Sequence, residues 1–535
     1  MKKIGILGGV GWASTIDYYR AICEGAGRFF AGRGAVSPLP APPITIESVV
    51  QAQTRSLRGR PGDEASWAAF DAVFREAMLT LAGVADASSK AQDIFDLETQ
   101  LAEAQWTKVD HRDYSKTYNK FAVADLGELT PDFDWNRFLA ESGAEVDSVI
   151  VSQPSFFEAT NRLMTEISLD TWKAYLKWQV IDSFAPVLSQ DFVDQNFAFY
   201  GKTLRGTLEI RPRWKRGVQA VERALGEALG QVYVREHFLP AAKARMEDMV
   251  DNLLLAYKHS IEELDWMTEE TKVKALEKLA TFNPKIGYPD AWLDYSALDV
   301  KPDDLFGNLM RSNIVEARRD LAKIGGPVDP NEWHMTPQTV NAYYNPVANE
   351  IVFPAAILQP PFFDLEAEDA VNYGAIGGVI GHEIGHGFDD QGSKFDGEGN
   401  LNNWWTDEDR EAFETLGKRL IAQYDAYEPL PGYHVNGALT LGENIGDLGG
   451  LTIAYEAYHL SLGDRPAPVM DRLTADQRLF IGWSQVWARI FRDEALIERV
   501  KSDPHSPSEY RANGTLENVS AFHEAFNTRE GDGMW

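Results

Sequence analysis

The sequence contains a single cysteine, Cys23, among 535 residues, so no disulfide can form within the chain. No run approaches about 20 consecutive apolar residues, and we therefore expect no membrane-spanning helix. Basic residues are also scarce: 51 lysines and arginines stand against 81 aspartates and glutamates, which gives a net charge of −30. Because phosphate groups bind to positive charge, this balance argues against a nucleic-acid or anionic-membrane partner.

A chain of 535 residues is too long for one hydrophobic core, so two or three domains are expected. Hydrophobic residues make up 44% and charged residues 25%, which is typical of a globular protein. The opening segment, Met1–Ala13, has the basic start of a signal peptide. Its apolar part is rich in glycine and lacks a small-residue cleavage site, so we interpret it as a strand entering a turn rather than as an export signal.

The first 85 residues have a pattern of their own. Lys3–Gly9 is predicted to be a buried strand that ends at glycines, and Ser14–Gly25 a helix. A second strand is expected at Ile44–Val50 and a second helix at Glu64–Leu81. Strands that alternate with helices in this order predict the beginning of a parallel α/β arrangement.

From about Ser88 onward, apolar residues recur at intervals of three and four, which predicts amphipathic helices. No cluster of titratable residues at metal-ligand spacing occurs in this region, and we interpret the helices as a scaffold. The predicted helices are Ala91–Trp106, Leu169–Phe184, Trp214–Leu229, Glu236–Lys258 and Thr268–Thr281.

Two short β-prone runs follow, Val340–Pro346 and Glu350–Pro354. They predict a hairpin, and their prolines favour a position at the edge of a sheet. An extended peptide can pair with such an edge by adding a strand to it.

The pentapeptide His382-Glu383-Ile384-Gly385-His386 lies in a helix predicted over Val371–Asp389. A spacing of four places both imidazoles on one face of the helix, where they can bind one Zn²⁺. Glu383 then lies where it can take a proton from the attacking water. The alternative is a buried helix whose histidines are satisfied by neighbouring side chains, so the motif depends on its context.

The context favours the metal site. A helix with this many glycines, at positions 374, 377, 378, 381, 385 and 387, is expected to press closely against other backbone. A second helical segment places Glu443 and Asp447 one turn apart. Glu443 would complete a set of two histidines and one glutamate, and Asp447 can accept the remaining N–H of a ligand histidine. Asp389 and Asp390 fit either a similar role or ordinary polarity at a helix end.

From about Ser88 to Trp535 the chain resembles the neprilysin and endothelin-converting-enzyme family of zinc peptidases. The resemblance rests on four motifs, and their joint occurrence is highly specific. They are Asn341–Tyr344, Gly381–Asp390, Glu443–Gly450, and His505–Pro507 with Arg511.

The resemblance implies a mainly α fold with small β elements, built of two lobes. Residues 88–320 would form a helical lid domain, and residues 321–535 a thermolysin-like catalytic domain. A partial α/β segment, residues 1–85, would precede them.

The resemblance also implies the role of each site residue. The ligands of a single Zn²⁺ would be His382, His386 and Glu443. The catalytic side chains would be Glu383, His505 and Asp447. The substrate backbone would be held by Asn341, Ala342 and Arg511. These roles suit the side chains, because an imidazole can donate to an oxyanion and a guanidinium presents a cationic fork to a carbonyl oxygen.

The opening segments Lys3–Thr15 and Tyr18–Arg20 instead resemble the start of an aspartate/glutamate racemase. That chemistry needs two facing thiols, and Cys23 is the only cysteine. We therefore interpret residues 1–85 as a fragment joined to a peptidase near Leu81–Asp86, and expect them to be dispensable for metal binding.

The function predicted from the sequence is a zinc-dependent metalloendopeptidase that hydrolyses oligopeptides on the amino side of hydrophobic residues. The alternatives are a chimera that binds zinc and peptide without turnover and, less favoured, an amino-acid racemase. The lack of disulfides suggests a bacterial origin, and the lack of an export signal suggests a cytoplasmic location for the chain as written. The oligomeric state and the compartment of a parent protein are left open.

Overall fold

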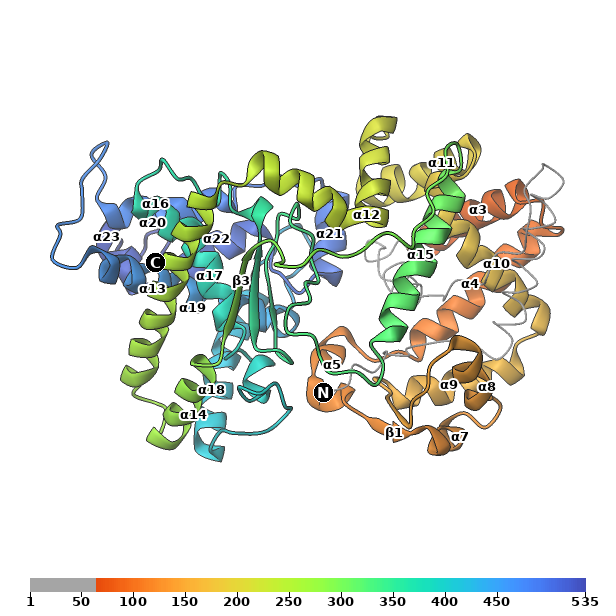
Figure 1. Cartoon of the computed structure of the whole chain (residues 1–535), viewed down its shortest axis with the longest axis horizontal. Coiled ribbons are helices and arrows are strands. Elements are labelled where there is room, and N and C mark those ends of the chain that lie inside the picture. The colour runs from red at the N-terminus through yellow and green to blue at the C-terminus, as the bar shows by residue number, and fades with distance from the viewer. Residues whose placement is uncertain (1–63) are drawn as a thin grey trace. The chain divides into compact units, whose positions relative to one another are not determined.

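The structure, a computed structural model, describes residues 64–535, which fall into two compact units (Figure 1). Of the described residues, the first unit contains 64–225 and 294–329, and the second contains 226–293 and 330–535. The strands and the helix predicted before residue 51 lie outside the described residues.

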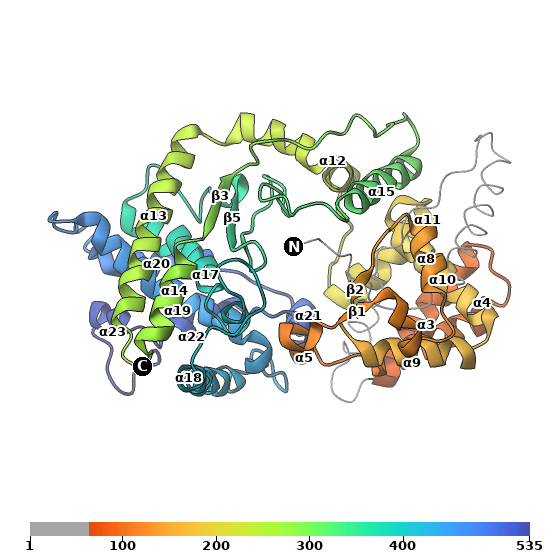
Figure 2. The same cartoon turned by 60° about the horizontal axis from the view of Figure 1, so that its bottom comes forward.

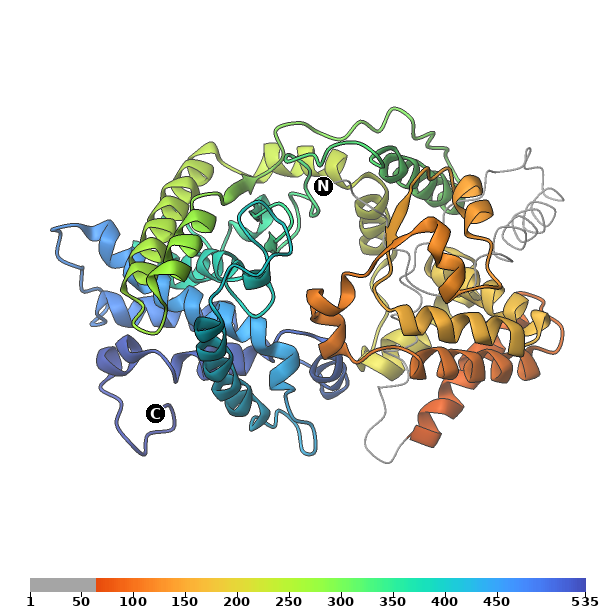
Figure 3. The ribbon, with the colours of Figure 1, turned by 90° about the horizontal axis from the view of Figure 1, so that it is seen from below.

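The first unit is mainly helical, with a two-stranded antiparallel ribbon of β1 (Lys120–Ala122) and β2 (Ser148–Ile150). Figure 3 shows its helices, coloured red to yellow except for the green α15, and several of them pack against one another. They are α3 (Glu64–Leu81), α4 (Ala87–Glu103), α5 (Lys108–Arg112), α6 (Tyr114–Thr117), α7 (Leu126–Leu129), α8 (Trp135–Ser142), α9 (Pro154–Glu166), α10 (Leu169–Phe184), α11 (Gln190–Asn196) and α15 (Leu305–Ala322).

Helix α3 has the bounds predicted from the sequence, but its place in the fold differs from the prediction. Met78 and Leu79 are fully buried in the same apolar core as Ile94 and Leu97 of α4. The apolar core of the first unit therefore includes residues on both sides of the predicted boundary at residue 85. Residues of α3 complete the core of the first unit, because the apolar face of α4 packs directly against them.

A buried ion-pair network joins α3 to α4. Arg75 Nη2 donates to Asp71 Oδ2 and to Glu98 Oε2, both at 2.6 Å, and the Arg75 side chain is 1% exposed. Gln179 of α10 donates to the other oxygen of Glu98 at 3.0 Å. The indole of Trp178 lies 5.0 Å from the guanidinium carbon. The network thus ties three helices to one buried cation.

The second unit contains a three-stranded sheet in the order β3-β5-β4, with β3 (Asn283–Gly287), β5 (Glu350–Pro354) and β4 (Tyr343–Asn345). β4 and β5 form the predicted antiparallel hairpin, and β3 pairs with β5 in parallel. The predicted edge position is correct for β4 and wrong for β5, which is central and fully buried. Pro354 is tolerated there because it is the last residue of its strand.

Figure 2 shows helices of the second unit gathered beside this sheet. They include α13 (Pro240–Glu263), α14 (Glu269–Leu279), α16 (Asp369–Asn372), α17 (Gly378–Gly385), α18 (Asp407–Asp425), α19 (Gly437–Leu462), α20 (Ala475–Val486), α21 (Asp493–Ser502), α22 (Ser508–Leu516) and α23 (Ser520–Phe526). The chain enters this unit within α12 (Arg213–His237), whose backbone is non-helical at Leu225, with φ −141° and ψ 36°. Residues 226–293, predicted to belong to the lid, share this compact unit with residues 330–535.

The helix predicted over Val371–Asp389 is formed by α16, a π-helical turn at Tyr373–Gly377, and α17. It ends at Gly385, earlier than predicted. The chain turns beyond this point because the Asp389 carboxylate accepts the backbone N–H groups that a continued helix would use internally.

Helices α17 and α19 touch through their backbones. A Cβ atom on Gly450 would lie 2.3 Å from the backbone nitrogen of His382, and one on Gly446 would lie 2.8 Å from His382 Nδ1. A Cβ atom on Gly381 of α17 would lie 2.6 Å from the carbonyl oxygen of Gly450, so only glycine permits this approach. This confirms the expectation that the glycine-rich helix presses against other backbone. The contact fixes His382 against α19.

In the described part of the chain, none of the helices combines the length and apolar character that crossing a bilayer requires.

The Arg75 network generates a stability prediction. Arg75→Met should lower the stability of the first unit by about 3–5 kcal/mol, because it leaves the buried carboxylates of Asp71 and Glu98 without a cation. Urea unfolding followed by tryptophan fluorescence measures the change. Arg137→Met is the control, since Arg137 forms an exposed pair with Glu141 and should change little. Equal unfolding midpoints for the two variants would contradict this account.

Candidate metal centre

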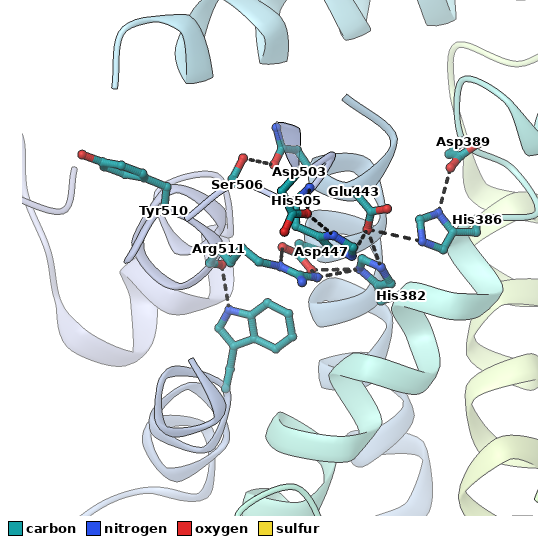
Figure 4. A network of polar contacts seen from close by, with 12 residues as sticks. His382, His386, Asp389, Glu443, Asp447, Asp503, His505, Ser506, Tyr510 and Arg511 are labelled. Atoms are coloured by element: carbon teal, nitrogen blue, oxygen red, sulfur yellow. Dashed lines mark hydrogen bonds and ion pairs between the residues drawn. The ribbon is translucent and has the colours of Figure 1, made fainter. Parts of the chain in front are cut away.

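His382 of α17, His386 directly after the end of α17, and Glu443 of α19 meet in the second unit (Figure 4). One ligand atom from each of His382, His386 and Glu443 lies within 4.8 Å of the others. Among the described residues 64–535, this is the one group of at least three histidine, cysteine or acidic side chains that lie close enough together to hold a metal ion. The structure therefore brings together the three residues predicted to be ligands.

Each histidine is oriented by a carboxylate on its outer nitrogen. His382 Nδ1 lies 2.8 Å from Asp447 Oδ1, and His386 Nδ1 lies 2.8 Å from Asp389 Oδ2. Because a carboxylate can only accept, both Nδ1 atoms carry a proton, so that in the neutral ring Nε2 is the nitrogen with the lone pair. This places the two lone pairs on the side of Glu443, as metal ligation requires.

The structure distinguishes the two aspartates that the sequence left open. Asp389 orients His386 and also accepts the backbone N–H groups of Gln391 and Gly392, at 2.8 and 2.7 Å. Asp390 instead accepts from the side chain of Gln391. Burial raises the pKa of Asp389, but its hydrogen bonds and the charge of His386 lower it overall, so the carboxylate is ionised.

The environment of Glu443 tests whether a cation fits here. Its Oε2 lies 3.2 Å from His382 Nε2, 3.6 Å from His386 Nε2 and 3.1 Å from His505 Nε2. None of these contacts has the alignment of a hydrogen bond, and this buried oxygen has no hydrogen-bond partner among the residues described. Two imidazole nitrogens and one carboxylate oxygen that lacks a hydrogen-bond partner form the donor set of a zinc site. A catalytic zinc site of this kind leaves a fourth position for water or substrate.

Asp447 is itself held by Arg511 of α22. Arg511 donates from Nε to Oδ2 at 2.7 Å and from Nη2 to Oδ1 at 2.6 Å, and the indole of Trp487 lies 3.8 Å from its guanidinium carbon. Burial raises the pKa of Asp447, but the charge and hydrogen bonds of Arg511 lower it overall. Nη1 is the guanidinium nitrogen that Asp447 leaves available. The contact of Arg511 with substrate remains a prediction.

Glu383, the predicted base, is 6% exposed and lies within electrostatic reach of His382, His386 and Glu443. Burial raises the pKa of its carboxyl group above the usual range, and the nearby imidazoles of His382 and His386 oppose this shift. A carboxylate of increased basicity beside a metal site suits proton transfer from water.

His505 approaches the same oxygen of Glu443 as the two ligand histidines. It also has a partner that the sequence analysis missed. Asp503 Oδ1 accepts from the backbone N–H of His505 at 2.9 Å and lies 2.8 Å from its Nδ1. Burial lowers the pKa of His505, but the charge of Glu443 and the hydrogen bond to Asp503 raise it to about 9. The signal was the Asp-Pro-His sequence itself, since an aspartate two residues before a histidine can close this local turn.

A second unpredicted contact anchors this loop to α19. Ser506 Oγ donates to Asn444 Oδ1 at 2.8 Å, and Asn444 Nδ2 donates to Thr440 Oγ1 at 2.9 Å. The residue next to His505 is thereby tied to the residue next to Glu443.

The predicted substrate-binding pair, Asn341 and Ala342, immediately precedes β4. Asn341 is exposed and Ala342 is 7% exposed. β4 contacts α17, which carries His382 and leads directly into His386. The pair lies in the same unit as the metal centre, and its role in binding substrate remains a prediction.

Comparison with known proteins identifies the family. The sequence models described as "Peptidase family M13" match residues 60–289 and 341–535 of this chain. The chain belongs to peptidase family M13, the neprilysin and endothelin-converting-enzyme family of zinc metallopeptidases. The match from residue 60 includes α3, in agreement with its packing in the first unit.

Individual relatives agree. Neprilysin-3 of Drosophila melanogaster is 34% identical over 478 residues, which cover 85% of this chain and 60% of that protein. Human endothelin-converting enzyme 1 is 35% identical over 460 residues, with coverage of 83% and 59%. The chain thus spans about three fifths of these relatives. The crystal structure of Mycobacterium tuberculosis zinc metalloprotease Zmp1 with an inhibitor is 48% identical, with a TM-score of 0.87, and covers 90% of this chain and 74% of that one.

The ligand geometry predicts distinct effects for neighbouring residues. His386→Ala should lose the metal, because only two ligands remain. Glu383→Gln should keep the metal and lose turnover, since it removes a base and no ligand. Metal content after dialysis, measured by mass spectrometry, separates the two variants. Equal loss of metal in both would refute the assigned roles.

Proposed function

We propose that this protein is a zinc-dependent metalloendopeptidase that binds one Zn²⁺ per chain and hydrolyses oligopeptides on the amino side of hydrophobic residues. The observation that carries the proposal is the convergence of buried His382 with the partly buried His386 and Glu443, within electrostatic reach of the buried Glu383. Membership of peptidase family M13 supports the reaction class. The preference for hydrophobic residues rests on resemblance to that family.

Zinc, when bound, would act as a Lewis acid that polarises the scissile carbonyl and increases the acidity of water. The protein side chains supply the proton transfers. The Glu383 carboxylate takes a proton from the attacking water, and its raised pKa favours holding that proton until the leaving amine accepts it.

His505 supplies a hydrogen bond where negative charge develops. Its Nδ1–H is directed at Asp503, so Nε2 can donate only when the ring is an imidazolium. A pKa raised to about 9 keeps the ring in that form at neutral pH. The imidazolium would then stabilise the oxyanion of the tetrahedral intermediate.

The edge of the sheet offers a place for an extended substrate. The order β3-β5-β4 leaves the outer side of β4 without a neighbouring strand among residues 64–535. A peptide laid along this side can pair with backbone groups, and the exposed side chain of Asn341 can bind its main chain. Arg511 Nη1 would donate a hydrogen bond to a neighbouring substrate carbonyl oxygen.

A cleavage assay tests the function directly. Purified protein should cleave a quenched fluorescent peptide with phenylalanine or leucine after the scissile bond, and should cleave the matched aspartate or lysine peptide far more slowly. A chelator should abolish cleavage and added Zn²⁺ should restore it. Stoichiometric zinc and peptide binding without cleavage would instead support the alternative of a binding protein without turnover.

The role of His505 generates a pH prediction. The imidazolium is present below its pKa and lost above it, so kcat/KM should fall as pH rises toward about 9. Zinc at Glu443 would neutralise part of the charge that raises this pKa and move the fall to lower pH. His505→Ala should reduce kcat by roughly 10²–10³ and remove this basic limb, with zinc retained.

The exposed His434 provides the control, and His434→Ala should leave both the rate and the pH profile unchanged. A basic limb that persists in His505→Ala would assign it to another group.

A further inference from the structure

A buried lysine on the last turn of α14 contacts the segment that follows the metal-site residue His386. Lys278 is 1% exposed. Its Nζ donates to three backbone carbonyls, those of Gly387 at 2.7 Å and of Gly392 and Phe395, both at 2.8 Å. An ammonium has three N–H donors, and all three are used here.

All three carbonyls belong to the segment 387–395, which directly follows His386. This segment carries Asp389, whose carboxylate orients the imidazole of His386. Gly392 joins the two: its N–H donates to Asp389 Oδ1 at 2.7 Å, and its carbonyl accepts from Lys278 at 2.8 Å. The ammonium is thus one residue away from the carboxylate that holds a metal ligand.

The segment folds back tightly on the end of α17. A Cβ atom on Gly392 would lie 1.7 Å from the carbonyl oxygen of His386, so glycine is required at this position. The turn brings the carbonyls of Gly387, Gly392 and Phe395 around one point. Three carbonyl dipoles directed at one point repel one another unless a cation occupies it, and Lys278 is that cation.

Lys278 also joins this segment to the β4–β5 hairpin. Its own carbonyl accepts from Asn349 Nδ2 at 3.1 Å, and the rings of Tyr344 and Phe388 each lie 5.8 Å from its Nζ. Burial lowers the pKa of Lys278 to about 7, while the charges of Asp389 and Asp396 raise it. The three accepting carbonyls require the protonated form, because a neutral amine would turn a lone pair toward one of them.

We propose that Lys278 is a positioning residue for the metal centre: it fixes the segment 387–395, and through Asp389 it fixes the orientation of His386. The inference rests on metal binding by the proposed site and is independent of peptidase turnover. Loss of the ammonium releases the carbonyls, so that the turn opens and Asp389 no longer holds the imidazole with its Nε2 toward the metal. Zinc then dissociates faster from a protein that remains folded.

The test compares zinc dissociation with stability in the full chain. Lys278→Met should lose zinc to a chromogenic chelator roughly 10- to 100-fold faster than the parent protein, the effect typical of losing a group that orients a ligand. Lys285→Met is the matched control. Lys285 is also buried, and it donates to Glu350 and to the carbonyl of Glu332 without touching the segment 387–395. It should lower the melting temperature and leave the zinc dissociation rate unchanged.

A double mutant shows whether Lys278 acts through the carboxylate. Asp389→Ala alone should accelerate zinc loss to a similar extent. Lys278→Met combined with Asp389→Ala should lose zinc no faster than Asp389→Ala, because the lysine then has no ligand partner left to position. Additive acceleration would overturn the proposal, and so would a normal dissociation rate in Lys278→Met.

A milder variant covers the case in which Lys278→Met fails to fold. Lys278→Gln retains two N–H donors and should give a folded protein with an intermediate dissociation rate. Parent-like zinc retention in Lys278→Gln with a lowered melting temperature would show that the lysine is merely structural. Since the readout is zinc release, a folded protein that binds zinc without cleaving peptides still tests the proposal.

Discussion

The direct backbone contact between α17 and α19 is the constraint on which the metal centre depends. Gly446 and Gly450 let the two helices approach so closely that a Cβ atom at either position would collide with His382. This brings His382 of one helix to the Asp447 carboxylate of the other, and places Glu443 opposite both histidines. A larger residue at either glycine would separate the helices and remove the third ligand from reach of the first two.

The same close packing gathers four acidic groups in one buried region, and each has its own compensation. Asp447 is neutralised by Arg511, and Asp389 by backbone N–H groups and His386. Burial raises the pKa of Glu383, which moves it toward the neutral form. Of these four groups, Glu443 is the one with a fully buried oxygen that lacks a hydrogen-bond partner among the described residues, and a cation bound there would complete the balance. The stability of this core and its ability to bind a metal therefore have one electrostatic cause.

Support for the centre extends well beyond the residues that would touch the metal. Ser506 ties the His505 loop to α19, Asp503 orients His505, and Lys278 gathers the segment that carries Asp389. These three residues lie up to about 230 positions apart in the sequence, and none is one of the three predicted metal ligands. Asp503 contacts the imidazole of His505 directly, whereas Ser506 and Lys278 act through intermediate groups. Such contacts give a flexible imidazole or carboxylate a single orientation.

The sequence by itself determined the local elements and the chemistry. A spacing of four predicted that the two histidines share one face, and apolar periodicity predicted the bounds of α3 and α10. The glycines predicted close packing between helices. Only the tertiary structure decided which side chains meet across long separations. In the structure, His386 is oriented by Asp389 and not by Asp390, and β3 pairs with β5. Helix α3 packs in the core of the first unit, and Lys278 donates to three carbonyls. Periodicity reports which face of an element is buried, whereas the partner on the other side depends on how distant segments pack.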